Sequence, residues 1–600
     1  MYHRRTHVWI AILAALTTAS VSADSPRDAL RTLLGEHHEW RLRENPQFAM
    51  ERGDYRNADK LDDESLAAIE RRDLTEAGYL ERLRKLDRAA LAPADQLDFD
   101  LFEQTLARRQ EGRRFRTFLA PINGRSGPHQ EIPQLHERVR FNDLIDYDSY
   151  VKRLEQVPRQ VDQLIERLKL GLAEGRTPPR VTVEGVPAQF KSLLDGGLRA
   201  LAEPLGYSTA KLTDAERAAL TKRFEDVSFP AVRAAMKKMG EFIEKDYLPG
   251  CREKIAASAW PDGEAFYAFQ LRSMTTTDLT AKQIHEIGMS EVKRIRGEMM
   301  HVIRKTDFLD LHPDAKSLAE DALFKRFIDY LRTDKRFYHE TAEDLLGEYR
   351  DVCKRIDAEL PRLFRMLPRQ PYGVKPIPAF MAPHQTTAYY QRGDMRNGQP
   401  GYFYANTFAL DQRPRYEMMA LSLHEAVPGH HFQIAIAQEL DDVPEFRKDL
   451  WYTAFGEGWA LYGERLGLEV GLYTNPYDDF GRLLYEMWRS CRLVVDPGMH
   501  ALEWPREKAV AFMLENTALS ELNINVEVDR YIAWPGQATG YKIGELKIRE
   551  LRARAEAKLA ARFDVREFHE VVLGGGCVPL DLLEKRVDLW IAGKGAAARP

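Results

Sequence analysis

The sequence predicts a mainly α-helical protein with a small β-sheet, and the spacing of its apolar residues is the main reason. Apolar residues recur three and four positions apart over most of the chain, as in the run SLAAIERRDLTEAGYLERLRKLDRAAL near the N-terminus. Strand signals are few, and the clearest is PGYFYANT at 400–407, where aromatic and small residues alternate. With 600 residues and 44% apolar side chains, the chain can bury a large core.

Residues 1–23 have the pattern of a secretory signal peptide. Arg4 and Arg5 precede an apolar run from Val8 to Leu16, and a small-x-small motif ends at Ala23. We therefore expect cleavage after Ala23 and a periplasmic or secreted protein. The apolar run is too short to cross a membrane, and no later stretch approaches about 20 apolar residues, so no stable membrane insertion is expected. No cysteine follows the run closely, so no lipid anchor is expected either.

The remaining chain is predicted to form two halves. Residues 24–250 form an N-terminal helical half that makes one wall of a groove, and residues 251–600 form the half that contains the motifs described below. A loop-like segment rich in Gly, Pro and polar residues, Arg114 to Phe141, suggests a long loop or a lid over a cleft. Because no linker divides the region after residue 250, the two halves are expected to work as one unit.

Charge and cysteine content exclude some classes of function. The formal net charge is −5 at pH 7 and there is no basic block, so nucleic acid is a poor candidate partner. The four cysteines are widely separated and lack the paired spacing of zinc ligands. In an oxidising compartment they are compatible with one or two disulfides, whose pairing the sequence leaves open. The oligomeric state is also left open.

The segment LSLHEAVPGHHFQ at 421–433 places three histidines and a glutamate close together. Imidazole nitrogens are good zinc ligands, and a carboxylate beside a zinc-activated water is the usual general base for amide hydrolysis. His424 is therefore a candidate zinc ligand together with His430 or His431, and Glu425 is a candidate base.

The spacing of these histidines requires the helix to be distorted. On an unbroken helix His430 and His431 would lie about 9 and 10.5 Å along the axis from His424, too far apart to share a metal. Pro428 has no N–H for the helix, and Gly429 can adopt backbone angles that other residues avoid. We expect the Pro-Gly step to bring one later histidine back towards His424.

A third zinc ligand is predicted in the segment AFGEGWALYGERL. Two histidines leave a tetrahedral zinc one protein ligand short if it is to keep a water. Glu457 is the best candidate, and its neighbours Gly456 and Gly458 each cost a helix about 1 kcal/mol, which indicates that the backbone comes close to another group there. Glu464, one heptad later, lies on the same side and is a candidate to hold a ligand histidine in place.

These motifs resemble known families. Read as HEA-(VP)-GH, the first segment resembles the HEAGH or HEFGH helix of gluzincin peptidases with two residues inserted, and HExxPGHH resembles the bacterial family DUF885. The resemblance implies an elongated helical gluzincin-like fold with a small sheet edging a deep active-site groove. It favours His430 over His431 as the second ligand. EGWALY resembles the gluzincin motif that donates the third ligand, and a strand over Tyr402 to Asn406 would line the cleft, with an ordinary core strand as the alternative.

The resemblance also suggests groups that stabilise the reaction intermediate. TGYKIG resembles the tyrosine-bearing turn of oligopeptidase-like gluzincins, which makes Tyr541 the first candidate donor to an oxyanion and Tyr531 the second. His500, which follows a predicted helix start at Asp496-Pro497, resembles a family position that supports the intermediate. Arg530 is a candidate for binding a substrate carboxylate, with a structural ion pair as the alternative.

The leading hypothesis is a zinc metallopeptidase, of an oligopeptidase or carboxypeptidase-like kind, that hydrolyses short peptides with Zn²⁺ as its cofactor. Two alternatives remain: a catalytically inactive peptide-binding protein on the same fold, and a zinc hydrolase of a non-peptide amide or ester.

Overall fold

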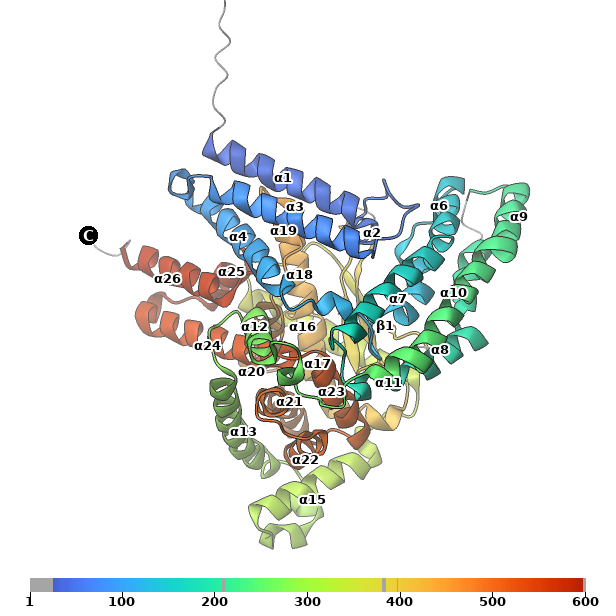
Figure 1. The fold of residues 1–600 in the computed structure, drawn as a ribbon. Coiled ribbons are helices and arrows are strands. Elements are labelled where there is room, and N and C mark those ends of the chain that lie inside the picture. The colour runs from blue at the N-terminus through green and yellow to red at the C-terminus, as the bar shows by residue number, and fades with distance from the viewer. Residues whose placement is uncertain (1–24, 208–210, 380–381, 383–384, 396–397, 597–600) are drawn as a thin grey trace, which may run out of the picture.

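The computed structural model describes residues 25–207, 211–379, 382, 385–395 and 398–596, so the predicted signal peptide lies outside the described residues. The protein is 72% helical with only 4% strand, which confirms the predicted mainly-α class. Figure 1 shows many helices surrounding one small sheet. No described helix is long and apolar enough to cross a membrane.

The first helices pack on the C-terminal part of the chain. They are α1 (Pro26–Glu44), α2 (Pro46–Glu51), α3 (Leu66–Arg84) and α4 (Pro93–Arg113). Prolines at the first turns of α1 and α4 lack an N–H that the helix would leave unpaired, so they begin helices without cost. Leu33, Leu83 and Phe102 enter one hydrophobic core together with Phe446 and Leu583. The first hundred residues therefore support the half that contains the motifs.

A second group of helices has a hydrophobic core of its own. Its members are α5 (Pro128–Glu131), α6 (Leu144–Leu154), α7 (Val157–Ala173), α8 (Val186–Asp195), α9 (Asp214–Arg223), α10 (Phe229–Phe242) and α11 (Leu248–Gly250). In α7 the buried residues Val157, Val161, Leu164 and Leu168 form one face, as their helical spacing dictates. The segment predicted as a lid contains α5 and short 3₁₀ turns, and it reaches the central part of the molecule.

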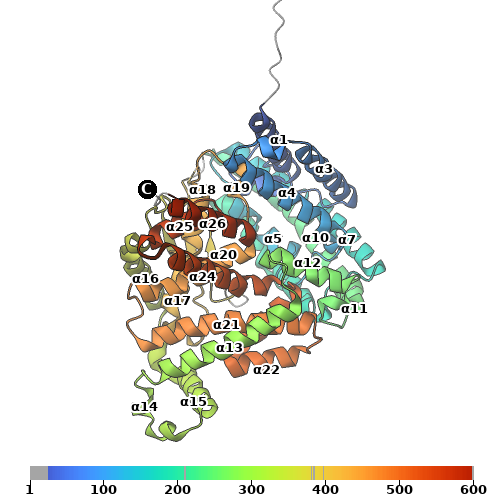
Figure 2. The same ribbon diagram turned by 90° about the vertical axis from the view of Figure 1, so that its left-hand side faces the viewer.

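A long buried helix forms the centre of the rest of the molecule. The helices here are α12 (Gly263–Thr275), α13 (Ala281–Ile303), α14 (Phe308–Leu311), α15 (Glu320–Thr333), α16 (Ala342–Leu363) and α21 (Pro476–His500). Figure 2 shows α13 lying along α21. Asp496-Pro497 was predicted to start a helix, but both lie in the last turns of α21. Packing of this buried helix outweighs the cost of one proline.

The sheet has three strands, β1 (Tyr372–Pro376), β2 (Ala388–Gln391) and β3 (Gly401–Ala405), in the order β1-β3-β2. β3 runs parallel to β1, with Tyr372 opposite Gly401, and antiparallel to β2, with Ala388 opposite Ala405. The prediction of a strand in PGYFYANT is confirmed, but its predicted place at the cleft is wrong. β3 is the central strand and both its edges are paired, because the preceding sequence supplies two further strands.

The C-terminal helices complete the fold. They are α17 (Met418–Glu425), α18 (His430–Gln438), α19 (Glu445–Lys448), α20 (Thr453–Glu469), α22 (Arg506–Asn516), α23 (Glu521–Ala533), α24 (Gly540–Leu559), α25 (Val565–Leu573) and α26 (Leu580–Ala596). α20 lies against α24 so closely that a Cβ on Gly458 would stand 2.5 Å from the Gly544 backbone. This confirms the close approach predicted at Gly458. All four cysteines are buried and free, so no disulfide forms among them.

Candidate metal centre

The predicted helix distortion is a complete break. α17 ends at Glu425 and α18 begins at His430, with the cis peptide Val427-Pro428 between them. Gly429 lies so close to the end of α17 that a Cβ would stand 1.8 Å from the carbonyl oxygen of His424. Only glycine fits at such an approach, and the turn therefore places His430 directly beside His424.

Three side chains converge at this break. Oε2 of Glu457, from α20, lies 3.2 Å from Nε2 of His430 and 3.6 Å from Nε2 of His424. One ligand atom from each residue lies within 4.8 Å of the other two. Ligand atoms about 2.0–2.1 Å from a tetrahedral zinc stand roughly 3.3 Å apart. The spacing therefore suits a zinc ion, and Oε2 of Glu457 is buried with no hydrogen-bond partner among the described residues.

Glu464 holds one of the imidazoles in place, as its heptad position suggested. Nδ1–H of His424 donates to Oε1 of Glu464 over 2.8 Å, which leaves Nε2 as the free lone pair facing Glu457. This carboxylate–histidine contact fixes the ring orientation and is typical of metal-binding histidines. Both side chains are buried.

The electrostatics of the three converging side chains favour a bound proton or cation among them. Burial lowers the pKa of His424, but its contacts with Glu457 and Glu464 outweigh burial and raise that pKa to about 9. Burial also raises the pKa of Glu457, but the neighbouring His430 and His424 hold it well below its usual range. Glu457 therefore remains ionised beside the imidazoles, and a bound cation would take the place of the protons.

Glu425 lies at the end of α17, next in sequence to His424, and lines the same cavity. It is 7% exposed, and its Oε2 has no hydrogen-bond partner among the described residues. A buried carboxylate oxygen without a donor is costly unless a ligand or water completes it. Its position suits a group that exchanges protons with a water molecule in the cavity.

His431 turns away from the cluster. Its ring packs against Tyr372 at 4.7 Å between centroids, and its Nδ1 lies 3.0 Å from the Tyr390 hydroxyl. Burial lowers the pKa of His431 to about 4, so the ring is neutral at ordinary pH. Of the two alternatives left by the sequence, His430 is the histidine that the structure brings to His424.

The predicted oxyanion donors lie in different places. Tyr541, in the first turn of α24, lines the cavity, and the Gln537 amide donates to its hydroxyl over 3.5 Å. The Tyr531 hydroxyl is buried, donates to Glu527 and accepts from Trp488 and Arg492. Because that hydrogen is already used, Tyr541 is the one of these two candidates whose hydroxyl hydrogen remains available in the cavity.

His500 is also remote from the cavity lining. It is fully buried, its Nδ1 accepts from the Ala257 N–H over 3.0 Å, and its Nε2–H donates to the Tyr531 carbonyl over 3.0 Å. Both ring nitrogens are therefore used to join three segments of the fold.

The cavity that contains the cluster has a volume of about 420 Å³. This lies within the range of about 300–1,000 Å³ typical of sites for small ligands. Its wall includes β2 residues Ala388 to Tyr390 rather than β3, together with Trp451 and Trp488. Arg125, from the segment predicted as a lid, also lines it. β2 is an edge strand of the described sheet, so its free edge can pair with an extended chain.

The sequence reasoning missed two arginines of this cavity, Arg489 and Arg492 on α21. Both are almost fully buried. A signal was present, because Arg482, Glu486, Arg489 and Arg492 recur at helical spacing within an otherwise apolar run. Four charged groups on one face of a buried helix indicate a polar wall rather than an ordinary core helix.

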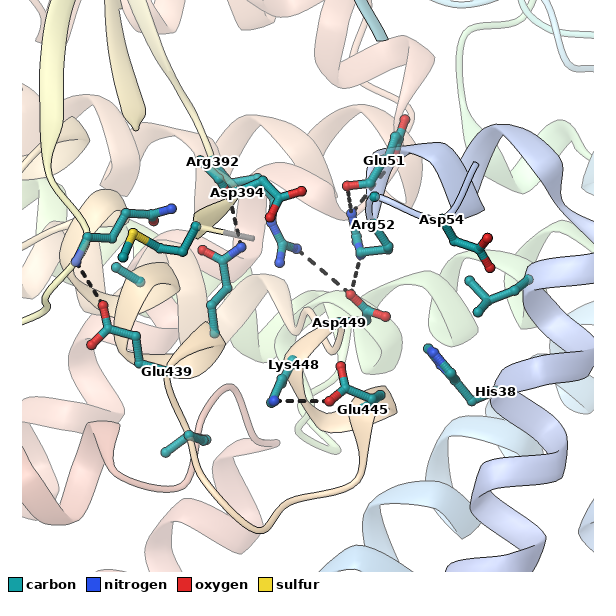
Figure 3. Close-up of a pocket in the computed structure, with 18 of the residues that line it drawn as sticks. His38, Glu51, Arg52, Asp54, Arg392, Asp394, Glu439, Glu445, Lys448 and Asp449 are labelled. Carbon is teal, nitrogen blue, oxygen red and sulfur yellow. Dashed lines mark hydrogen bonds and ion pairs between the residues drawn. The ribbon is translucent and has the colours of Figure 1, made fainter. Parts of the chain in front are cut away.

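A larger cavity, of about 1,110 Å³, lies between α2, the chain after β2 and the region of α18 and α19. Figure 3 shows several of its charged side chains paired with one another, among them Lys448 with Glu445. Asp449 pairs with Arg52 and lies 4.0 Å from Arg392, and Glu439 accepts from Arg369. The three candidate metal ligands do not line this cavity.

The fold and the cluster together define a helical protein with a candidate two-histidine, one-glutamate metal centre. Its residues 46–587 match the model of a family described as "Bacterial protein of unknown function (DUF885)", and the chain belongs to that family. No curated protein matches it.

Solved structures share the fold, and two of them are putative lipoproteins. "The crystal structure of the putative lipoprotein from Colwellia psychrerythraea" is 26% identical, with a TM-score of 0.86, and the match covers 95% of this chain and 100% of that one. A structure described as "a putative lipoprotein of unknown function from Shewanella oneidensis" is 19% identical, with a TM-score of 0.69, and the match covers 94% and 99%. The second likeness concerns the fold alone.

Proposed function

We propose that this protein is a zinc-dependent peptidase that hydrolyses short peptides in the cavity around His424. The observation that carries the proposal is the convergence of His424, His430 and Glu457 beside the unpartnered carboxylate oxygen of Glu425. Three protein ligands with a base next to them are the composition of a catalytic rather than a structural zinc site.

The chain's own groups have separate tasks in this proposal. Zinc held by the three ligands would activate a water and polarise the carbonyl of the scissile bond. Glu425 takes a proton from that water and passes it to the leaving nitrogen as the C–N bond breaks. The Tyr541 hydroxyl donates to the carbonyl oxygen as it gains negative charge. Glu464 keeps His424 in the orientation that leaves Nε2 available.

A location outside the cytoplasm fits this proposal. The first 23 residues have the signal-peptide pattern, and the Colwellia structure is described as that of a "putative lipoprotein". A short-peptide hydrolase in that compartment would act on peptides that enter from outside or are released from the cell envelope.

Metal content and peptide digestion test the function together. Purified protein should contain about one zinc per chain, and Glu457→Ala should lose it. Glu425→Gln should retain the zinc and lose hydrolysis of a peptide library by at least about 100-fold, because only the proton acceptor is removed. Full zinc occupancy in Glu457→Ala would remove the ligand assignment.

The same experiment separates the alternatives. Zinc-free protein that still binds peptides would support the inactive binding protein. Zinc-loaded protein that leaves every peptide intact but hydrolyses amide or ester model substrates would support a non-peptide hydrolase.

A further inference from the structure

The wall of the metal-site cavity is unusually rich in arginine. Four arginines line it, and Glu527 is the only lining carboxylate among the described residues that is not already assigned to the zinc site. The arginines are Arg125, Arg489, Arg492 and Arg530. Guanidinium groups remain charged at all ordinary pH values, so this wall has an excess of positive charge that suits an anionic ligand.

The hydrogen bonds of two of these arginines, Arg530 and Arg492, show which one has a nitrogen without a partner. Arg530 donates from Nε and Nη2 to Glu527 and from Nη1 to Gln537, so each of its three nitrogens already has a partner within the protein. Arg492 donates from Nε to Tyr531 and from Nη2 to Glu527, but its Nη1 is buried with no partner among the described residues. The candidate named from the sequence, Arg530, is therefore structural, and Arg492 has a free donor.

Arg489 is the second arginine with an unused donor. Its Nε is buried without a partner among the described residues, and its Nη2 lies 3.7 Å from Oε1 of Glu464. Nη1 reaches the Tyr485 carbonyl only at 3.5 Å. Arg489 and Arg492 are about one helical turn apart on α21, so their side chains lie on the same side of the helix, and both line the cavity. A buried guanidinium N–H without an acceptor is costly, and a ligand oxygen would remove that cost.

Both arginines lie close to the groups of the candidate metal centre. Arg489 is next to Glu464, which accepts from the ligand His424. The guanidinium of Arg492 lies 4.5 Å from the ring centroid of Tyr541. Both arginines line the same cavity as the three candidate metal ligands, so an anion bound by them would lie in the cavity that contains the candidate metal centre.

We propose that Arg489 and Arg492 bind the C-terminal carboxylate of the substrate, so that the protein releases the last residue of short peptides that end in a free carboxylate. This inference rests on the proposed peptidase function and specifies its substrate class. Each arginine donates one charge-assisted hydrogen bond to the carboxylate, and the cavity of about 420 Å³ leaves room for a short chain.

The test uses tripeptides with acetylated N-termini that vary in their last residue, each made as a free acid and as a C-terminal amide. We expect kcat/KM for the free acids to exceed that for the amides by at least about 100-fold, because the amide removes the charge that the two arginines bind. The released product should be the last amino acid.

Variants of the arginines identify the responsible groups. Arg492→Gln should reduce the preference for free acids to below about 10-fold, and Arg492→Lys should restore part of it, because lysine keeps the charge but not the fork. Glu527 keeps both bonds from Arg530 in these variants, so the fold should persist. Arg506→Gln, which removes a pair with Asp529 outside the cavity lining, is the matched control.

Binding separates failure of this inference from failure of the proposed function. Calorimetry with Glu425→Gln measures affinity without turnover, and the free acids should bind at least about 10-fold more tightly than the amides. Equal affinity, or a preference that survives Arg492→Gln and Arg489→Gln, would overturn the carboxylate site even if peptides are cleaved. A preference for free acids in protein without zinc or hydrolysis would support the site and refute the peptidase.

Discussion

At the scale of single residues, the proposed function depends on charged side chains with single polar atoms that have no hydrogen-bond partner among the described residues. Most buried polar atoms are hydrogen-bonded in folded proteins, so unpaired ones mark places where a ligand acts. Here Glu425, Glu457, Arg489 and Arg492 line one cavity, and each has a buried polar atom without a hydrogen-bond partner among the described residues. The proposed function and the proposed carboxylate site both follow from these four side chains.

Glu464→Gln should weaken zinc binding without unfolding the protein. Glutamine can still accept from Nδ1–H of His424 but lacks the charge that makes this imidazole a stronger ligand. Loss of such a supporting carboxylate typically costs 10–100-fold in metal affinity, and we expect a loss of about that size. Competition with a chromophoric chelator measures it. Glu469 lies on the same helix as Glu464 and pairs with Arg552 of α24. Glu469→Gln should therefore have no effect on zinc affinity.

At the scale of elements, the break between α17 and α18 brings the ligands together. Gly429→Ala should place a methyl group against the His424 carbonyl and force the two helices apart. We expect a destabilisation of about 1–3 kcal/mol, together with loss of zinc. Gly347→Ala, at an exposed position in α16 with nothing within 4 Å of its Cβ, should be neutral or slightly stabilising. Denaturant unfolding and zinc content measure both variants, and unchanged zinc content in Gly429→Ala would contradict the geometry.

The end of α21 should make stability depend on pH. Burial raises the pKa of Asp496 to about 7, although the carboxylate accepts from the Tyr267 hydroxyl and the Gly536 N–H. The folded protein therefore keeps a proton that the unfolded chain releases near pH 3.8, and stability falls as pH rises between these values. Asp496→Asn keeps both acceptor contacts and removes this dependence.

The comparison isolates the contribution of this one group. Between pH 4 and pH 7 the free energy of unfolding of Asp496→Asn should rise by roughly 3–4 kcal/mol relative to that of the natural protein. The contributions of other titrating groups cancel when the two free energies are subtracted. Unfolding in urea at several pH values measures it. A difference that stays constant with pH would show that Asp496 titrates normally in the folded protein.

At the scale of the whole molecule, distant segments meet around the candidate centre. Helices from the first hundred residues share a core with α20 and α24, and Arg125 reaches the cavity from the N-terminal half. A metal bound by α17, α18 and α20 would stabilise the folded state alone, because the unfolded chain separates its ligands.

Removing the metal should therefore lower the thermal midpoint. For zinc at 100 times its Kd, the stabilisation is about 2.7 kcal/mol, which chelation would abolish and added zinc would restore. Scanning calorimetry with and without a chelator measures the shift. His424→Ala should show no shift on chelation, and an equal shift in that variant would place the stabilising metal elsewhere.

The sequence by itself determined the fold class and the composition of the candidate centre. Helical periodicity depends on local burial and needs no tertiary information, so the helices around Glu457 and through the N-terminal region were predictable. The Pro428-Gly429 step also predicted that the helix would not continue. Proline lacks the N–H that a helix needs, and glycine can adopt backbone angles that other residues avoid.

Only the tertiary structure decided the rest. The spacing in the sequence allowed either His430 or His431 to be the second ligand. In the structure, Gly429 packs on the end of α17 and brings His430 beside His424. The central position of β3, the internal use of the Tyr531 hydroxyl and the free donors of Arg489 and Arg492 depend on neighbours far away in the chain. Which polar groups lack a hydrogen-bond partner depends on the complete tertiary structure, because the partner of each group comes from a residue far away in the sequence.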